Sequence, residues 1–316
     1  MSRHASLNRV YRVVFNRSKG VWQAVAEIGK SAGKSTSPRQ KAPGLVKTLV
    51  ALAQQLTPKA LIGSLFFVSA SALAAELPQN GQVTHGQANI QSDGQNMTVN
   101  QTSDKAAINW DSFDIGKQNS VTFDQPSASS VALNRVTGSD PSKIQGALNA
   151  NGQVFLINPN GITFTQDAQV NVGGIVASTL DIDTDDFLNG DYTFQGDSSS
   201  AIVNQGNIQS QDGYVAMIAA QIENSGNIQA NSGSVVMGAG QKVTLDMGGP
   251  VKIEIEEKAL NAHIQNGGAI KADGGLVYLT AQAAGDLASS VINNDGIIEA
   301  QTLETGEGGE IYLMGD

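Results

Sequence analysis

Asn204-Gln205-Gly206-Asn207-Ile208, followed by Gly213-Tyr214-Val215-Ala216-Met217, is the stretch of this 316-residue chain that decides its fold. The two phrases, Asn-x-Gly-x-Ile and Gly-x-Val/Ile-x-Met/Leu, return three more times before the chain ends. The repeat-defining residues are Asn204, Gly206 and Ile208; Asn224, Gly226 and Ile228; Asn266, Gly268 and Ile270; and Asn294, Gly296 and Ile298. Such recurrence indicates a stack of similar structural units over residues 201–316.

The spacing of the repeat selects the kind of stack. The first two copies lie 20 residues apart, whereas helical repeats and propeller blades need about 33 residues or more. Leucine-rich repeats have a similar period, but their dense leucine signature is missing. One coil of a parallel β-helix fits: alternate aliphatic residues point inward, and glycine supplies positive φ at the corners. The sequence therefore predicts an all-β solenoid.

Two irregularities interrupt the array. The second and third copies lie 42 residues apart, and the excess holds two alternating runs, 241–245 and 251–255, around Gly248-Gly249-Pro250. We expect a β-hairpin there that projects from the array. The fourth copy has gained six residues around 302–306, where we expect a loop. The chain stops inside this last repeat without a closing cap, which indicates a truncated chain.

Residues 76–200 show the same alternation without a clean period, and we expect an N-terminal cap and the first coils there. Strand-like runs occupy 131–136, 153–157, 162–164 and 170–172. Asp140 and Pro141 predict a short helix over 141–148, and Asp185 and Asp186 with a following Gly190 predict a second one near Thr184. An irregular unit at 76–130 would cover the first exposed edge of the solenoid.

The first 75 residues form a separate segment. They carry eleven Lys and Arg residues against one acidic residue, Glu27, although the whole chain has a net charge of −10. Residues 60–75 are uncharged and end in small residues, which predicts signal-peptide cleavage at Ala74 or Ala75. A transmembrane helix is the alternative, but this apolar run falls short of the roughly 20 residues needed. Upstream, residues 7–27 mix basic and aromatic residues, for which a surface amphipathic helix is one interpretation.

A tight turn separates two of the predicted strands. Asn158-Pro159-Asn160-Gly161-Ile162 lies between 153–157 and 162–164. Proline fixes φ, Asn160 tolerates the bridge or left-handed region, and glycine releases the chain into the next strand. A turn of this kind carries little functional signal by itself, and it is the surrounding sequence that makes these five residues the candidate secretion motif.

The surroundings of this turn resemble a known family. Residues 133–138, 144–146, 152–157 and 172–180 read, in order, Leu-Asn-Arg-Val-Thr-Gly, Ile-Gln-Gly, Gly-Gln-Val-Phe-Leu-Ile and Val-Gly-Gly-Ile-Val-Ala-Ser-Thr-Leu. The succession is similar to the haemagglutination-activity, or two-partner secretion, domain of filamentous haemagglutinin-like exoproteins. The presequence resembles the extended signal-peptide region of large Gram-negative autotransporters and two-partner exoproteins.

The resemblance implies a right-handed parallel β-helix that is secreted to the cell surface. It implies export by the Sec translocon, then recognition in the periplasm by the POTRA domains of a TpsB-type outer-membrane β-barrel transporter. The chain would pass through that transporter unfolded and seed β-helix folding outside. Adhesion, contact-dependent inhibition by a toxin, haemolysis and haem capture occur among full-length relatives. Receptors on host cells or bacteria would bind regions beyond this chain.

Other functions find little support in the sequence. The acidic mature part disfavours nucleic acid as a partner. The scattered His4, His85 and His263 suggest no metal site and no cofactor. Asp181 to Asp186 begins like a calcium loop but lacks the required glycine and glutamate, so we expect solvated carboxylates at a helix start. A β-helical carbohydrate-active enzyme is the remaining alternative, and it would need carboxylates aligned across coils. We expect no catalysis.

Overall fold

The computed structural model describes residues 11–16, 21–26, 77–211, 213–249, 251–284, 291–301 and 309–315. The chain divides into two compact units, 1–68 and 69–316. In the first, β1 (Tyr11–Asn16) and β2 (Val21–Ala26) pair antiparallel, so these residues form strands and not the surface helix. The predicted cleavage site at Ala74 and Ala75, and the predicted loop at 302–306, lie outside the described residues.

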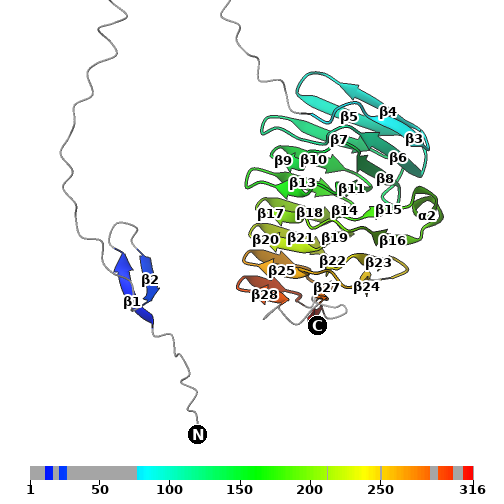
Figure 1. Cartoon of the computed structure of the whole chain (residues 1–316). Coiled ribbons are helices and arrows are strands. Elements are labelled where there is room, and N and C mark those ends of the chain that lie inside the picture. The colour runs from blue at the N-terminus through cyan, green and yellow to red at the C-terminus, as the bar shows by residue number, and fades with distance from the viewer. Residues whose placement is uncertain are drawn as a thin grey trace, which may run out of the picture. The chain divides into compact units, whose positions relative to one another are not determined.

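The second unit is a parallel β-helix, which confirms the predicted fold class (Figure 1). Three sheets run along the stack. The first sheet, in spatial order, contains β4 (Ala88–Ser92), β5 (Asn96–Gln101), β7 (Ser120–Asp124), β10 (Ala147–Ala150), β13 (Gln169–Val172), β18 (Asn207–Gln211), β21 (Asn227–Asn231), β26 (Ala269–Lys271) and β29 (Ile297–Glu299). The second contains β3 (Gln82–His85), β6 (Lys105–Trp110), β8 (Val131–Val136), β11 (Gln153–Ile157), β14 (Gly174–Ser178), β19 (Tyr214–Ala219), β22 (Ser234–Ala239), β27 (Leu276–Ala281) and β30 (Glu310–Gly315).

The third sheet is shorter because it receives one strand from each of six successive coils and has no added antiparallel strand at its first edge. It contains β9 (Ser142–Ile144), β12 (Ile162–Phe164), β17 (Ala201–Asn204), β20 (Gln221–Asn224), β25 (His263–Asn266) and β28 (Ile292–Asn294). We number the coils by their first-sheet strands, so that coils 1 to 8 begin at β5, β7, β10, β13, β18, β21, β26 and β29. The order of colours in Figure 1 follows this stack from one end to the other.

Aliphatic residues at matching positions of successive coils fill the interior. In the first sheet, Val170 pairs with Ile208, Ile208 with Ile228, and Ile228 with Ile270. All four side chains are buried. Burying each one contributes about 1.5–3 kcal/mol before the loss of conformational entropy is counted. The alternation seen in the sequence is therefore the inward-facing row of the helix.

The N-terminal end departs from the parallel pattern, as the irregular segment predicted. β3 pairs antiparallel with β6, and β4 pairs antiparallel with β5, whereas the later strands of these two sheets pair in parallel. The two antiparallel strands lie at the first edge of both sheets. Backbone groups of coil 1 that would otherwise be free are therefore paired on this side.

The predicted short helix over 141–148 is wrong. This segment forms β9 and β10, separated by the corner at Gly146. Ser142 and Ile144 point inward while Lys143 is exposed, and β9 pairs in parallel with β12. Pairing with the neighbouring coil prevails over the local helix signals because it both satisfies the backbone hydrogen-bonding groups and buries Ile144.

The second predicted helix is confirmed as α2 (Thr184–Asn189). The Asp183 carboxylate accepts hydrogen bonds from the backbone N–H groups of Asp185 and Asp186. Gly190 ends the helix with a φ of 90°.

Within the described residues, no helix is long and apolar enough to cross a membrane.

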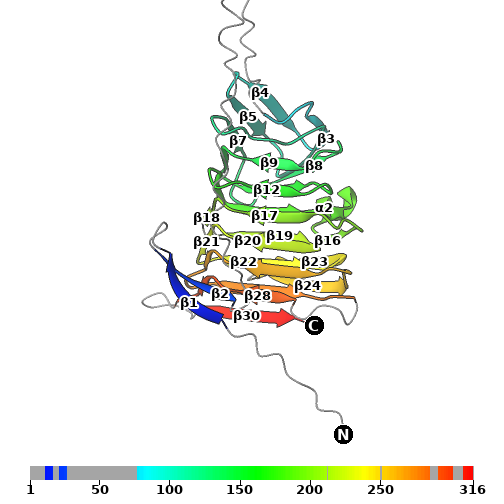
Figure 2. The same ribbon diagram turned by 60° about the vertical axis from the view of Figure 1, so that its left-hand side comes forward.

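The predicted hairpin is β23 (Lys242–Asp246) and β24 (Lys252–Glu257), which pair antiparallel. It leaves coil 6 and joins β15 (Asp181–Ile182) and β16 (Tyr192–Gln195), which leave coil 4. We call this four-stranded antiparallel sheet the side sheet; it appears beside the stack in Figure 2. One face of the hairpin is buried, whereas Glu254, Glu256 and Glu257 are exposed.

Candidate functional site

The Asn-Pro-Asn-Gly turn connects β11 to β12 in coil 3. The Gly161 N–H donates to the Asn158 carbonyl oxygen at 3.1 Å, which closes the turn. Gly161 has a φ of 113°, so it, and not Asn160, is the residue with a positive φ. Asn160 was expected in the bridge or the left-handed region, and the left-handed alternative is excluded. The positive φ at position 161 explains why glycine must stand there.

Asn158 lies at the centre of a buried hydrogen-bond network. Its side chain is fully buried. Its amide nitrogen donates to the Asp140 carbonyl oxygen and to the Ser142 hydroxyl, both at 3.0 Å. Its amide oxygen accepts from the backbone N–H of Asn160 at 2.9 Å and from the Asn160 side chain at 3.1 Å. The side-chain amide is thus satisfied on both sides, as burial requires.

The rest of the turn contacts the coils on either side. The Asn160 side chain donates to the Gly138 carbonyl oxygen of coil 2 at 2.9 Å. The Pro159 carbonyl oxygen accepts from the Ser198 hydroxyl of coil 4 at 2.6 Å. Ile162 is buried and stands between Ser142 of coil 2 and Ile202 of coil 4. The structure therefore brings all five predicted site residues together, and they join three successive coils.

The polar groups of this turn have a structural role: they hold neighbouring coils together. None of its five residues has an ionisable side chain, and its polar groups are amides and carbonyls bonded within the protein. It offers neither a nucleophile nor a general acid or base. Its direct effect is to fix the position of β12 relative to β9 and β17.

The four repeat-defining asparagines form a ladder through the third sheet. The amide nitrogen of Asn204 donates to Asn224 at 2.8 Å, Asn224 to Asn266 at 2.7 Å, and Asn266 to Asn294 at 2.6 Å. The first three are buried. The sequence shows that these asparagines recur but not that they bond to one another. The signal that could have revealed these bonds is the constant position of asparagine in the repeat, because residues at one position of successive coils stack on one another.

Replacing Asn224 with alanine should lower the free energy of unfolding by about 2 kcal/mol, because it strands two buried amide groups. The Asn204 nitrogen loses its acceptor and the Asn266 oxygen loses its donor. Urea unfolding of purified protein measures the change. Asn227→Ala is the matched control, because Asn227 donates to Asn207 at 2.9 Å on the exposed face, where water replaces the bond. Equal losses in the two variants would contradict the ladder's importance.

The repeat-defining glycines serve a purpose other than the predicted one. Gly206, Gly226, Gly268 and Gly296 are not among the residues with positive φ. A Cβ on Gly226 would instead collide with the Gly206 carbonyl oxygen of the previous coil, and Gly268 and Gly296 repeat this arrangement. Glycine is needed because the stacked corners approach too closely for a side chain.

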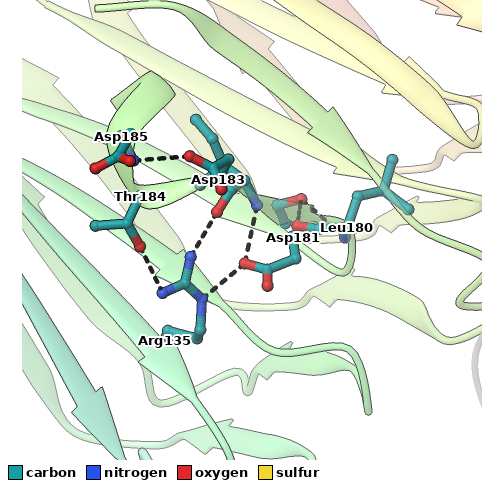
Figure 3. A network of polar contacts seen from close by, with 8 residues as sticks. Arg135, Leu180, Asp181, Asp183, Thr184 and Asp185 are labelled. Atoms are coloured by element: carbon teal, nitrogen blue, oxygen red, sulfur yellow. Dashed lines mark hydrogen bonds and ion pairs between the residues drawn. The ribbon is translucent and has the colours of Figure 1, made fainter. Parts of the chain in front are cut away.

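The acidic run from Asp181 to Asp186 is organised by Arg135, a residue that sequence reasoning missed (Figure 3). The Arg135 guanidinium donates to the Asp181 carboxylate at 2.8 Å, to the Thr184 hydroxyl at 3.2 Å and to the Ile182 carbonyl oxygen. Asp183 caps α2. The Asp181 and Asp183 carboxylates therefore accept hydrogen bonds from protein groups. Within the described residues, no cluster of three or more His, Cys, Asp or Glu side chains could hold a metal ion.

Comparisons with known proteins agree with the fold. The TPS secretion domain family matches residues 74–310, and the Extended Signal Peptide of Type V secretion system matches residues 8–56. Two heme/hemopexin-binding proteins of Haemophilus influenzae are 36% identical over 259 residues and 35% identical over 277 residues, each alignment covering 78% of this chain. The chain spans 28% and 29% of the lengths of these relatives.

A solved structure is similar over much of the same region. The HMW1 secretion domain from Haemophilus influenzae has a TM-score of 0.68 and 36% sequence identity, over 74% of this chain and 62% of that chain. The family resemblance inferred from residues 133–180 is thereby confirmed. The chain belongs to the TPS secretion domain family and, with its extended signal peptide, is the secretion domain of a two-partner exoprotein that Gram-negative bacteria export across the outer membrane.

Proposed function

We propose that residues 76–316 are recognised in the periplasm by the POTRA domains of a TpsB-type outer-membrane transporter and then seed β-helix folding at the cell surface. The observation that carries this proposal is the buried turn at Asn158–Ile162, which joins coils 2, 3 and 4 near the start of the stack. A joint in the first coils fixes the strand register that later coils copy.

The alternation of apolar and polar residues along the chain suits recognition by the transporter before the chain folds. An extended segment with apolar residues on one side can add a strand to the edge of a POTRA sheet, which pairs backbone groups and accepts alternate side chains in pockets. The chain has no cysteine, so no disulfide can close a loop before transit. The Sec translocon delivers the chain to the periplasm through the presequence, which is removed at Ala74 or Ala75.

We further propose that these residues have no catalytic activity. Outward-facing positions on successive coils carry amides: Asn149 pairs with Asn171, Asn171 with Gln209, and Gln209 with Gln229. A polysaccharide hydrolase of this fold needs converging carboxylates at such positions. The amide rows disfavour the enzyme alternative.

The activity of the whole exoprotein is a separate proposal. The relatives are named for heme and hemopexin binding, and this chain matches less than a third of their length. We assign adhesion, toxin delivery, haemolysis or haem capture, with the receptors on host or bacterial cells, to regions beyond the secretion domain. Sharing a fold with those relatives does not imply that this chain binds their ligands.

Export in a reconstituted strain tests the secretion proposal. The chain is expressed with and without a POTRA-containing outer-membrane transporter from the same genome. We expect protein in the medium only when the transporter is present, with an N-terminus at Ala75 or Glu76. Release without the transporter would contradict the proposal, and a mature start upstream of residue 60 would contradict the signal assignment. Transporters with the POTRA domains deleted provide the control for recognition.

A further inference from the structure

The side sheet connects insertions from coils that are not neighbours. β16 leaves coil 4 and β23 leaves coil 6, yet they pair antiparallel with Tyr192 opposite Leu245 and Phe194 opposite Val243. Phe194, Val243 and Leu245 are buried. They belong to an apolar cluster that also includes Leu133, Phe155, Val176 and Val236 of the second sheet. The same cluster contains Ala216 of coil 5, so the side sheet packs on strands from coils 2 to 6.

Aromatic residues form the centre of that contact. The ring of Phe155, in coil 3, lies 5.7 Å from the ring of Phe187, 5.4 Å from that of Tyr192 and 6.2 Å from that of Phe194. Phe187 belongs to α2, and the other two belong to β16. Aromatic pairs at such separations add stabilisation beyond the area they bury.

Two basic residues tie the coil 4 insertion back to the start of the stack. Arg135, in coil 2, binds Asp181, Ile182 and Thr184 (Figure 3). Lys105, in coil 1, donates to the carbonyl oxygens of Phe187 at 2.8 Å and of Leu188 at 3.0 Å, at the end of α2. Its amine also lies over the rings of Phe187 and Tyr192.

These contacts change how the stack can open. In a simple solenoid each coil contacts only its two neighbours. Stabilisation therefore passes from one coil to the next, and the two ends can unfold separately. Here one insertion binds coil 1 through Lys105 and coil 2 through Arg135, and reaches coil 6 through β23. We propose that the side sheet is a latch that couples the first coils directly to coil 6, so that they open as one unit. The latch belongs to the folded chain and does not depend on the transporter proposed above.

The pairing also has a consequence for the order of folding. The strands that close the latch, β23 and β24, end at Glu257, whereas the residues that it holds begin at Lys105. The first five coils can therefore form before the latch closes. Closure adds contacts from β23 and β24 to strands that have already stacked.

A reversible cross-link across the side sheet tests the latch. Thr193 and Thr244 stand opposite each other, with their hydroxyl oxygens 2.8 Å apart on the solvent side. The chain contains no cysteine, so Thr193→Cys with Thr244→Cys creates a single possible disulfide. Hydrogen exchange of the full chain is then measured by mass spectrometry, oxidised and reduced. Each single-cysteine variant serves as the control for oxidation.

We expect oxidation to slow amide exchange in β8 of coil 2 by about tenfold or more, because a closed latch holds coil 2 directly. β29 of coil 8 is the internal control. It lies two coils beyond coil 6, just as β8 lies two coils before coil 4, and none of the side-sheet contacts described above reaches it. Its exchange should change by less than about twofold.

Three results would overturn the latch. Equal slowing in β8 and β29 would mean that stability spreads only between neighbouring coils. Slowing confined to β16 and β23 would mean that the side sheet is a local appendage. Failure of the two cysteines to cross-link would mean that β16 and β23 do not pair in solution. In the oxidised background, Arg135→Gln should restore part of the β8 exchange rate, and an unchanged β8 rate would argue against coupling through Arg135.

Discussion

Replacing Asn158 with alanine should abolish release of the protein through its transporter and lower the free energy of unfolding by about 4 kcal/mol. The side chain is fully buried and takes part in hydrogen bonds with the Asp140 carbonyl oxygen, the Ser142 hydroxyl and both nitrogens of Asn160. Alanine leaves these groups without partners where water does not replace them easily, and each stranded polar group costs about 1–3 kcal/mol. Release is measured by immunoblotting of the medium, and stability by urea unfolding.

The location of the variant protein separates the two parts of this prediction. Retention in the periplasm would mean that the transporter reads the motif before folding. Release of protein that is sensitive to protease would mean that the motif acts in folding outside. Asn171→Ala is the matched control, because Asn171 is an exposed asparagine on β13 with its side chain directed away from the core. Normal release of folded Asn158→Ala protein would reduce the motif to an ordinary turn.

Replacing Gly226 with alanine should lower the free energy of unfolding by about 3 kcal/mol, with the loss centred on coils 5 and 6. The new Cβ would collide with the backbone carbonyl oxygen of Gly206, and Gly226 itself lies against Gly268 of the next coil. Two stacked corners would have to separate, which weakens the strand pairs on both sides. Urea unfolding gives the magnitude, and hydrogen exchange of β18 and β21 gives the position.

A second glycine supplies the comparison for this substitution. Gly249, in the turn between β23 and β24, has no atom within 4 Å of the position a Cβ would take, and its φ is not in the positive range. Gly249→Ala should leave the free energy of unfolding within about 0.5 kcal/mol of the parent value. If the two alanine variants were equally stable, close stacking at the corners would not be the reason for the repeated glycine.

Periodicity explains why much of this fold could be predicted from sequence. Each coil has nearly the same backbone path as the previous one, so a residue's position in the repeat also gives its position in the stack. Ile208, Ile228, Ile270 and Ile298 recur at one position, and the structure stacks them in one row. The turn at Asn158–Ile162 could be located from local signals, since its proline fixes φ and its glycine permits the positive φ that the turn needs.

Prediction failed where a distant partner decided the outcome. Residues 141–148 carry helix-start signals, yet pairing with β12 and burial of Ile144 make them strands. The repeat glycines were expected at positive φ, but the clash at Gly226 is with an atom of another coil. Arg135 reads as a lone charge in an apolar run, and its partners lie more than 40 residues later.

The sequence by itself determined the class of the molecule: a presequence, a β-helix with a recurring Asn-x-Gly-x-Ile phrase, and an Asn-Pro-Asn-Gly turn between two strands. These features depend on interactions within a coil or on one pairing rule repeated along the chain. Only the tertiary structure decided that the asparagines bond into a ladder and that two insertions close one side sheet over coils 2 to 6. The physical reason is that such contacts depend on which surfaces meet after the coils have stacked, and no local pattern specifies that meeting.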